Sequence, residues 1–380
     1  MVLGGVETEL ITVLKRFDKS KYDITLLLLY EQDNEILKRI PEGIKIVNLD
    51  ISKQYYCSGL STLVKERIKR GEIIPAIKLC FKRMFGISPT GANVDIDTIP
   101  SIEEEYDYAV CYHMHSPVML RYVADKVKAK RKIIWIHNEF NRARYKIEKY
   151  DKWLFKYYRV VAVSKQLRDE FVSKLPSLEE YVTVAHNIVD EQLIFEKSKD
   201  LSHLDTRFKN NTSFKLLTIG RFVEQKGYDI AVETARILRD KGLDFTWYII
   251  GYGVEEDNIR MLVNRYSLED KFIILGKKDN PYPYTLLCDL YVQTSRHEGF
   301  SITLTEALVL GKTIVCTRFA GSEQIQTSDD GTVVNTFEPV DIANEIERYI
   351  LAPELLKKSV ENGVNSQNGW NKIEALFTEE

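Results

Sequence analysis

Short apolar runs alternate with longer amphipathic segments along most of the chain. Runs rich in β-branched and aromatic residues predict strands, whereas apolar positions that recur every three or four residues predict helices. Two series of strands are predicted in this way: 23–30, 44–50, 106–113, 131–137, 159–164 and 181–187, then 214–220, 244–251, 271–276, 289–295, 312–317 and 331–335. Because these strands are apolar on both faces, the pattern predicts an α/β protein with two doubly wound parallel sheets.

A polar, weakly patterned stretch at 196–213 separates the two series and predicts a linker. A length of 380 residues also favours two domains, which we place at 1–195 and 196–365. No run of 18 or more apolar residues is present, and the first residues lack the pattern of a signal peptide. Five scattered cysteines without metal-ligand spacing favour a reduced, cytoplasmic protein.

Basic residues are concentrated in the N-terminal half, although the net charge is only -3. Residues 121–168 hold 15 Lys and Arg against 4 Asp and Glu, a field that favours an anionic surface or substrate. Residues 61–86 interleave bases with Ile, Leu, Phe and Met. They predict either an amphipathic helix resting on anionic lipid or a core-packed helix with a solvated basic face. Nucleic acid is not an expected partner, because no recognition module is present and the C-terminal half is acidic.

Ligands of open parallel sheets bind beyond the carboxyl ends of the strands. Gly220 and Arg221 follow one predicted strand, and Lys226 and Gly227 precede a helix. The arginine and the lysine can converge on one dianionic group such as a diphosphate. The alternative is two solvated surface bases.

The stretch "SRHEGFSITLTEAL" (295–308) places Glu298 and Glu306 eight positions apart around a predicted helix start. Gly299 permits close backbone approach, and Phe300, Ser301 and Ile302 offer N–H groups to phosphate oxygens there. At about 1.5 Å per residue the carboxylates lie up to about 12 Å apart, the scale of a nucleotide sugar. Carboxylates also accept hydrogen bonds from sugar hydroxyls. The alternative is that Glu298 is an acid that caps the helix and Glu306 is a solvated helix residue.

Three histidines follow predicted strands in the N-terminal half. His137 has either a structural role or a role in ligand binding. His113 and His115 have a His-x-His spacing that can bind metal, but no third ligand is evident.

Together these motifs resemble family 4 of the retaining glycosyltransferases, which has the GT-B fold of two Rossmann-like domains facing across a cleft. The resemblance rests on Gly220-Arg221 with Lys226-Gly227, Glu298-Gly-Phe and Glu306-Ala, "GKTIV" (311–315) and Gly331. In the N-terminal half it adds "LGGVETEL" (3–10), "IIWIHNEF" (133–140) and "VTVAHNIVD" (182–190), and near the end "GWNKIEALF" (369–377). Such ordered motifs are specific as a set.

The resemblance implies a role for each matching residue. Arg221 and Lys226 bind the donor diphosphate and stabilise the leaving nucleotide, with no metal and no cofactor, since the nucleotide diphosphate sugar is the substrate. Glu298 contacts the transferred sugar, Phe300 and Ser301 touch the phosphate through backbone amides, and Glu306 holds the ribose. Gly299 belongs to the donor-binding set by allowing close backbone approach. Gly4 and Gly5 let backbone approach the diphosphate, and His137 orients sugar or acceptor. The catalytic set is therefore Glu298, His137, Arg221 and Lys226.

The resemblance implies transfer of a hexose, from a UDP-sugar, to a lipid-linked or growing surface polysaccharide, with retention by same-face attack. A peripheral membrane protein at the inner face of the plasma membrane fits the basic segments 61–86 and 121–168. Two alternatives stay open: a sugar-nucleotide 2-epimerase and a non-catalytic glycan- or nucleotide-binding relic.

The family's glycine-rich loop follows a first strand, whereas only "MVL" precedes Gly4 here. We therefore expect the first strand to be missing and its neighbours to lack a partner, so that either the chain begins inside the fold or the authentic start lies upstream. The closing helix at 366–380 is expected to pack back on the first domain.

Overall fold

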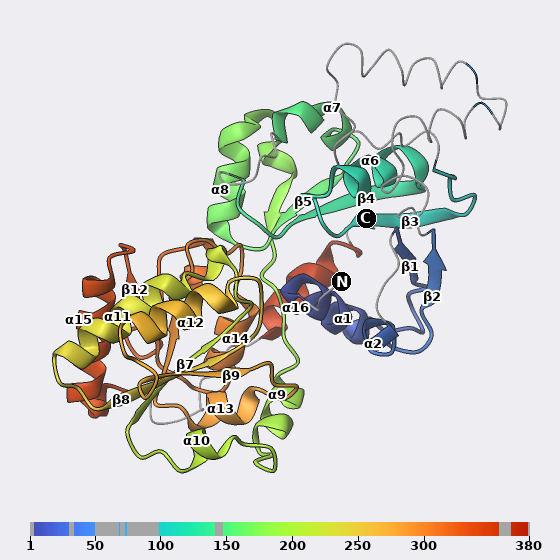
Figure 1. The fold of residues 1–380 in the computed structure, drawn as a ribbon. Helices are drawn as coiled ribbons and strands as arrows, with labels where there is room; N and C mark the ends of the chain where they lie inside the picture. Colours follow the sequence, from blue (N-terminus) through green and yellow to red (C-terminus); the bar gives the residue numbers. More distant parts are fainter. Residues whose placement is uncertain are drawn as a thin grey trace. The chain divides into compact units, whose positions relative to one another are not determined.

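The computed structural model describes residues 4–29, 34–49, 99–140, 147–356 and 366–378, together with the single positions 68 and 73 (Figure 1). The predicted membrane-binding segment 61–86 lies outside these residues apart from Ile68 and Ile73, as do Cys57 and Cys80. The other three cysteines, Cys111, Cys288 and Cys316, are buried free thiols.

All twelve predicted strands are present, each within a few residues of its predicted position. They are β1 (Thr25–Leu28), β2 (Lys45–Asn48), β3 (Glu105–Cys111), β4 (Lys128–Ile136), β5 (Arg159–Ala162), β6 (Val182–Val184), β7 (Phe214–Ile219), β8 (Phe245–Ile250), β9 (Phe272–Gly276), β10 (Leu290–Gln293), β11 (Ile314–Thr317) and β12 (Gly331–Val334). The pairs β1-β2 and β3-β4 and all five pairs of the C-terminal sheet are parallel, as expected for apolar strands joined by helical crossovers.

Helices connect most consecutive strands. Their bounds are α1 (Gly5–Arg16), α2 (Asn34–Leu37), α6 (Pro117–Lys126), α7 (Asp151–Leu154), α8 (Lys165–Lys174), α9 (Glu191–Ser198), α10 (Thr206–Lys209), α11 (Tyr228–Asp240), α12 (Glu256–Arg265), α13 (Tyr282–Leu287), α14 (Ile302–Val309), α15 (Pro339–Leu351) and α16 (Ser366–Ala375).

The chain forms two compact units. One comprises Met1–Val161 with Phe171–Thr183, and the other Ala162–Glu170 with Val184–Glu380. In the second unit α16 packs on the chain after β6, where a Cβ on Gly369 would lie 2.9 Å from Ile188. The domain boundary predicted at residue 195 and the packing of 366–380 on the first domain remain predictions.

The N-terminal strands form two separate sheets in the described part of the chain. The pair β1-β2 stands apart from the four-stranded sheet β3-β4-β5-β6. No ladder joins β1 or β2 to β3 among the described residues, and the absence of a first strand remains a prediction.

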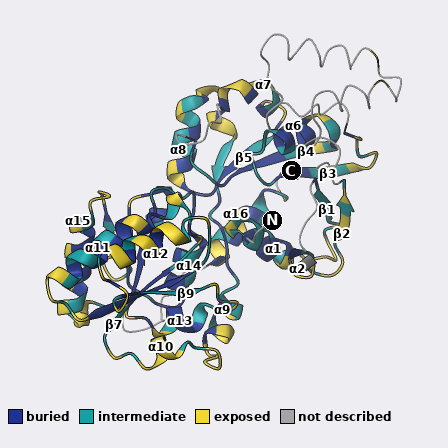
Figure 2. Ribbon diagram, in the orientation of Figure 1, coloured by how far each residue is buried: buried dark blue, intermediate teal, exposed yellow. Residues whose placement is uncertain are grey.

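The C-terminal unit contains one six-stranded sheet in the order β12-β11-β10-β7-β8-β9. The strand order reverses between β7 and β10, and such a switch point is where open parallel sheets bind ligands. Large side chains, including the fully buried Trp247, fill both faces of this sheet beneath α11, α13, α14 and α15. Figure 2 shows the strands as the buried layer and the outer helix faces as the exposed one.

The predicted linker at 196–213 contains part of α9 and all of α10 instead of being unstructured. Phe208, 1% exposed, packs edge-on against Tyr248 and Tyr284 in the C-terminal core. One buried aromatic residue among polar neighbours creates no periodic pattern, which is why the sequence suggested a linker.

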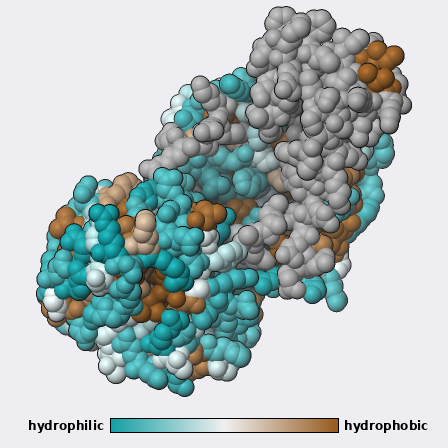
Figure 3. All heavy atoms as spheres, in the orientation of Figure 1, coloured by the Kyte–Doolittle hydropathy of each residue, from teal (hydrophilic) through white to brown (hydrophobic). Residues whose placement is uncertain are grey.

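Hydrophilic side chains cover most of the C-terminal unit on the face shown in Figure 3. Among the described residues, no helix combines the length and the apolar character needed to cross a bilayer.

Candidate functional site

The turn after β7 brings Lys226 to the switch point of the C-terminal sheet. The 3₁₀ helix η4 (Glu224–Lys226) leads into Gly227, which has the left-handed φ of 64° and precedes α11. A Cβ on Gly227 would lie 2.1 Å from the carbonyl oxygen of Thr294, so only glycine allows this turn to pack against the end of β10. The Thr294 hydroxyl donates to the carbonyl oxygens of Gly227 (2.9 Å) and Lys226 (3.2 Å).

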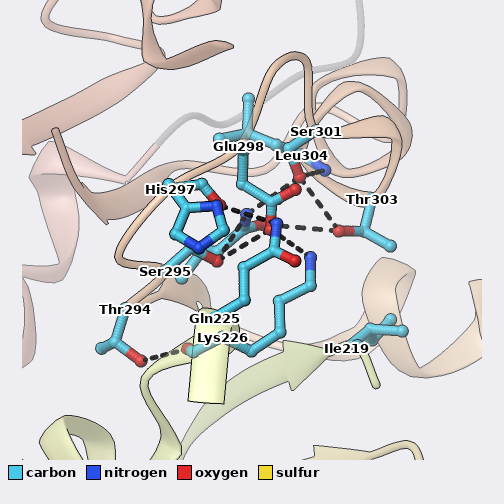
Figure 4. A network of polar contacts seen from close by, with 12 residues as sticks. Ile219, Gln225, Lys226, Thr294, Ser295, His297, Glu298, Ser301, Thr303 and Leu304 are labelled. Atoms are coloured by element: carbon cyan, nitrogen blue, oxygen red, sulfur yellow. Dashed lines mark hydrogen bonds and ion pairs between the residues drawn. The ribbon is translucent and has the colours of Figure 1, made fainter. Parts of the chain in front are cut away.

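Lys226 and Glu298 form an ion pair within this site. Lys226 Nζ lies 2.5 Å from Glu298 Oε1, and the side chains are only 15% and 11% exposed (Figure 4). The hydroxyl of Ser295 donates to the same carboxylate oxygen at 3.0 Å. The structure thus brings together the predicted diphosphate-binding lysine and the predicted sugar-binding carboxylate, in surroundings that strengthen their attraction.

The loop 298–301 ends at the start of α14. Ser301 is the N-cap, and its hydroxyl accepts from the amide of Leu304 at 3.4 Å and from Gln293 Nε2 at 2.9 Å. The Ser301 side chain is therefore occupied by capping, and the backbone is what remains for a ligand. In the described part of the chain, the amides of Gly299 and Phe300 have no protein acceptor.

Gly321 holds this loop in place from the 3₁₀ helix η5 (Ala320–Gln324). Its amide donates to the carbonyl oxygen of Glu298 at 3.3 Å, and a Cβ at Gly321 would lie 2.8 Å from the Cα of Phe300. The absence of a side chain therefore lets η5 pack directly on the loop.

Glu306 lies in the second turn of α14 and is half-buried. Burial raises the pKa of its carboxyl to about 7, and a hydrogen bond from the Tyr282 hydroxyl, 2.9 Å from Oε1, opposes that rise. The carboxylate is thus near half ionised at neutral pH. Tyr282, from α13, is a partner that the sequence did not predict.

Arg221 follows β7 and is exposed. Among the described residues its guanidinium has no hydrogen bond or ion pair, so the structure does not join it to Lys226 or Glu298. Its charge stands at the carboxyl end of β7, and its convergence with Lys226 on one anion remains a prediction.

A second set of contacts, not predicted from the sequence, reaches Phe300. The ring of His186 stacks on Phe300, with centroids 5.4 Å apart and planes 27° apart, and its Nε2 lies 3.1 Å from Glu323 Oε1. The Glu323 carboxylate also accepts from the amide of Lys165 at 2.9 Å. A polar residue after β6 and a glutamate in η5 were weak signals, because neither stands in a recognised motif.

In the N-terminal unit, Gly4 and Gly5 open α1. Gly4 is the N-cap, and its amide donates to Glu7 Oε2 at 3.1 Å. A Cβ on Gly4 would lie 2.7 Å from that same oxygen, so the glycine permits this compact start. The approach of this backbone to a diphosphate remains a prediction.

His137 follows β4 and is 4% exposed. Its ring lies 4.9 Å from that of Tyr112 and 6.4 Å from that of His113, and neither ring nitrogen has a partner among the described residues. Burial lowers the pKa of His137 well below its ordinary value, so the imidazole is neutral near pH 7. A neutral imidazole can donate through one nitrogen and accept through the other.

His113 and His115 lie near each other, with ring centroids 6.1 Å apart. Burial lowers both pKa values, that of His115 to about 4. No group of His, Cys, Asp or Glu suited to a metal ion occurs within the described ranges.

Residues 203–366 match the family model described as glycosyl transferases group 1. The N-acetylgalactosamine-N,N'-diacetylbacillosaminyl-diphospho-undecaprenol 4-alpha-N-acetylgalactosaminyltransferase of Campylobacter jejuni is 26% identical over 185 residues, which cover 47% of this chain and 47% of that protein. The N-acetyl-alpha-D-glucosaminyl L-malate synthase of Bacillus anthracis is 28% identical over 199 residues, covering 52% and 51%. The chain thus spans about half the length of these curated relatives.

A solved structure shows likeness over the whole chain. HepE of Anabaena in complex with UDP-glucose superposes with a TM-score of 0.70 at 15% identity, covering 99% of this chain and 96% of HepE. The likeness confirms the predicted α/β architecture of two Rossmann-like domains. The chain therefore has the GT-B fold, and its residues 203–366 are similar to the glycosyl transferases of group 1.

Proposed function

We propose that this protein is a retaining, family 4 glycosyltransferase that moves a hexose from a nucleotide diphosphate sugar, a UDP-sugar, to a lipid-linked or growing surface polysaccharide. The observation that carries the proposal is the pairing of Lys226 with Glu298 at the switch point between β7 and β10, next to the start of α14. A cation, unpartnered backbone amides and carboxylates gathered there suit a ligand with both phosphates and hydroxyls.

A solved structure supports the choice of donor, whereas the relatives and the charge of the chain bear on the choice of acceptor. HepE was solved with UDP-glucose, which favours a UDP-sugar as donor here. The Campylobacter relative is named for a saccharide on diphospho-undecaprenol, whereas the Bacillus relative is named for L-malate. Between these, the basic excess in residues 121–168 favours the lipid-linked saccharide, whose diphosphate is anionic.

In this reaction the bond between the sugar C1 and the donor phosphate oxygen breaks, and a bond from C1 to the acceptor oxygen forms on the same face. The acceptor hydroxyl gives its proton to the departing phosphate oxygen. Lys226, Arg221 and the backbone amides of the loop before α14 stabilise the charge that develops on the nucleotide diphosphate, in place of a metal ion. Glu298 orients the sugar hydroxyls and Glu306 the ribose, and His137 contributes a neutral hydrogen-bonding group to the sugar or the acceptor.

Slow hydrolysis of the donor tests this proposal without knowledge of the acceptor. UDP-glucose, UDP-galactose and their N-acetyl forms are incubated with the protein and EDTA, and the released sugar is followed by proton NMR before mutarotation. We expect the α-anomer to appear first and UDP to accumulate. First appearance of the β-anomer would contradict retention, dependence on added metal would contradict metal independence, and conversion of the donor to its 2-epimer would favour an epimerase.

A further inference from the structure

The N-terminal unit displays two aromatic rings, each flanked by two cations. The guanidinium of Arg121 and the ammonium of Lys152 lie 4.8 Å and 4.0 Å from the ring centroid of Trp153. Arg131 and Arg159 lie 4.8 Å and 4.5 Å from that of Tyr158. We call these six residues, together with the exposed Phe155, the basic-aromatic patch.

Contacts with Asp125, near the end of α6, fix one side of this patch. Trp153 Nε1 donates to Asp125 Oδ2 at 2.8 Å, and Lys156 Nζ lies 2.6 Å from Oδ1. The indole is therefore held in one orientation by an acid that is already neutralised. Phe155 is 57% exposed, so an aromatic side chain projects into solvent two positions after Trp153.

We propose that the basic-aromatic patch docks the protein on an anionic lipid bilayer. Trp and Tyr favour the headgroup region, where the ring is partly wet and partly apolar, while Arg and Lys attract anionic lipids. An exposed Phe adds apolar area that can enter the acyl boundary. The surplus of 15 bases over 4 acids in 121–168 gives the charge complementarity that such a surface requires.

The patch lies at the end of the sheet opposite to His137. Tyr158 and Phe155 precede the start of β5, and Trp153 contacts Asp125, which precedes the start of β4, whereas His137 follows the end of β4. Variants of the patch are therefore expected to leave donor hydrolysis unchanged. The reason for membrane docking rests on the proposed lipid-linked acceptor. The test uses lipid vesicles without donor or acceptor, so a failure to bind vesicles would not affect the transferase proposal.

Trp153 provides a built-in probe. The other three tryptophans, Trp135, Trp247 and Trp370, are 2%, 0% and 7% exposed, whereas Trp153 is half-buried at the surface. Vesicles of phosphatidylcholine alone, or with phosphatidylglycerol, are prepared with brominated acyl chains, which quench only tryptophans at the bilayer. We expect sedimentation and quenching with the anionic vesicles, both weakened by salt.

Variants separate this patch from any other membrane contact. Trp153→Phe should retain binding but lose the quenching. Lys152→Ser should weaken binding about fivefold, the equivalent of ~1 kcal/mol for one base at an anionic surface, and Phe155→Ser should weaken it several-fold. Leu351→Ser is the matched control, because Leu351 is 68% exposed on the acidic helix α15. Absence of vesicle binding, binding without Trp153 quenching, or equal binding to neutral vesicles would overturn the proposal.

Discussion

Lys226 Nζ lies 2.5 Å from Glu298 Oε1, joining the turn after β7 to the loop after β10. With side chains only 15% and 11% exposed, each charge depends on the other for stabilisation. If a donor enters as proposed, the lysine exchanges one anion for another, the diphosphate, and the carboxylate exchanges its cation for sugar hydroxyls.

Lys226→Ala is expected to lower kcat/KM for the UDP-sugar by about 10²–10³, because it removes a charge that stabilises the departing nucleotide. Lys226→Arg should recover part of this loss. Lys241→Ala is the control, since Lys241 is also ion-paired at 2.5 Å, with Glu347, but lies at the end of α11. Donor hydrolysis measures all three, and a similar loss in Lys241→Ala would contradict a specific role for Lys226.

The two glutamates should separate chemistry from binding. Glu298→Gln is expected to lower kcat while leaving the affinity for UDP nearly unchanged, because UDP lacks the sugar that Glu298 contacts. Glu306→Gln should weaken UDP binding about tenfold, as one charge-assisted hydrogen-bonding group to the ribose is lost. Calorimetric titration with UDP and hydrolysis rates give both quantities, and equal effects in the two variants would refute the division.

Donor affinity should rise with pH and level off above neutrality. The pKa of Glu306 is about 7, and only the ionised carboxylate accepts strongly from both ribose hydroxyls. At pH 6 about a tenth of the carboxyl is ionised, so the dissociation constant for UDP-glucose should be about tenfold higher than at pH 8. UDP-glucose is preferable to UDP, whose terminal phosphate itself titrates near ~6. In Glu306→Gln the dissociation constant for UDP-glucose should not change with pH. If it changes as in the wild type, a group other than Glu306 titrates.

The same carboxyl should make folding stability depend on pH. Its folded pKa, about 7, lies above the unfolded value of ~4.3, so the folded state binds the proton more tightly. This contribution to stability is complete below ~4 and is lost as the pH rises through about 7. Denaturant unfolding of wild type and Glu306→Gln should show that the variant lacks this decline, whereas parallel curves would contradict the raised pKa.

Gly227 should tolerate alanine far less than another glycine of similar backbone angle. Gly227 and Gly242 have φ values of 64° and 74°, but a Cβ would meet Thr294 O at 2.1 Å in the first and nothing within 4 Å in the second. Gly242→Ala should cost ~1–2 kcal/mol from the left-handed backbone, and Gly227→Ala at least ~3 kcal/mol. Guanidinium unfolding measures both, and equal losses would contradict the close packing of the turn on β10.

The periodicity predicted the strands well because burial on both sheet faces leaves a continuous apolar run, as in β8, where all six residues are buried. The motifs also predicted that Lys226 and Glu298 follow strand ends and that Glu306 lies in a helix, as the structure has them, whereas their roles toward a ligand stay predictions. They missed Tyr282 and His186, whose partners Glu306 and Phe300 are distant in sequence. Contacts of that kind depend on how elements pack, which short-range pattern does not encode.

Release of nucleotide diphosphate from UDP-sugars, in EDTA and with a lipid-linked saccharide as acceptor, tests the central claim most directly. Wild type should release UDP in step with extension of the saccharide, and Lys226→Ala and Glu298→Gln should lose that release while Lys241→Ala retains it. Failure of the wild type to release nucleotide from any UDP-, GDP- or ADP-sugar, or full activity in the Lys226 and Glu298 variants, would contradict a glycosyltransferase site at the junction of β7 and β10.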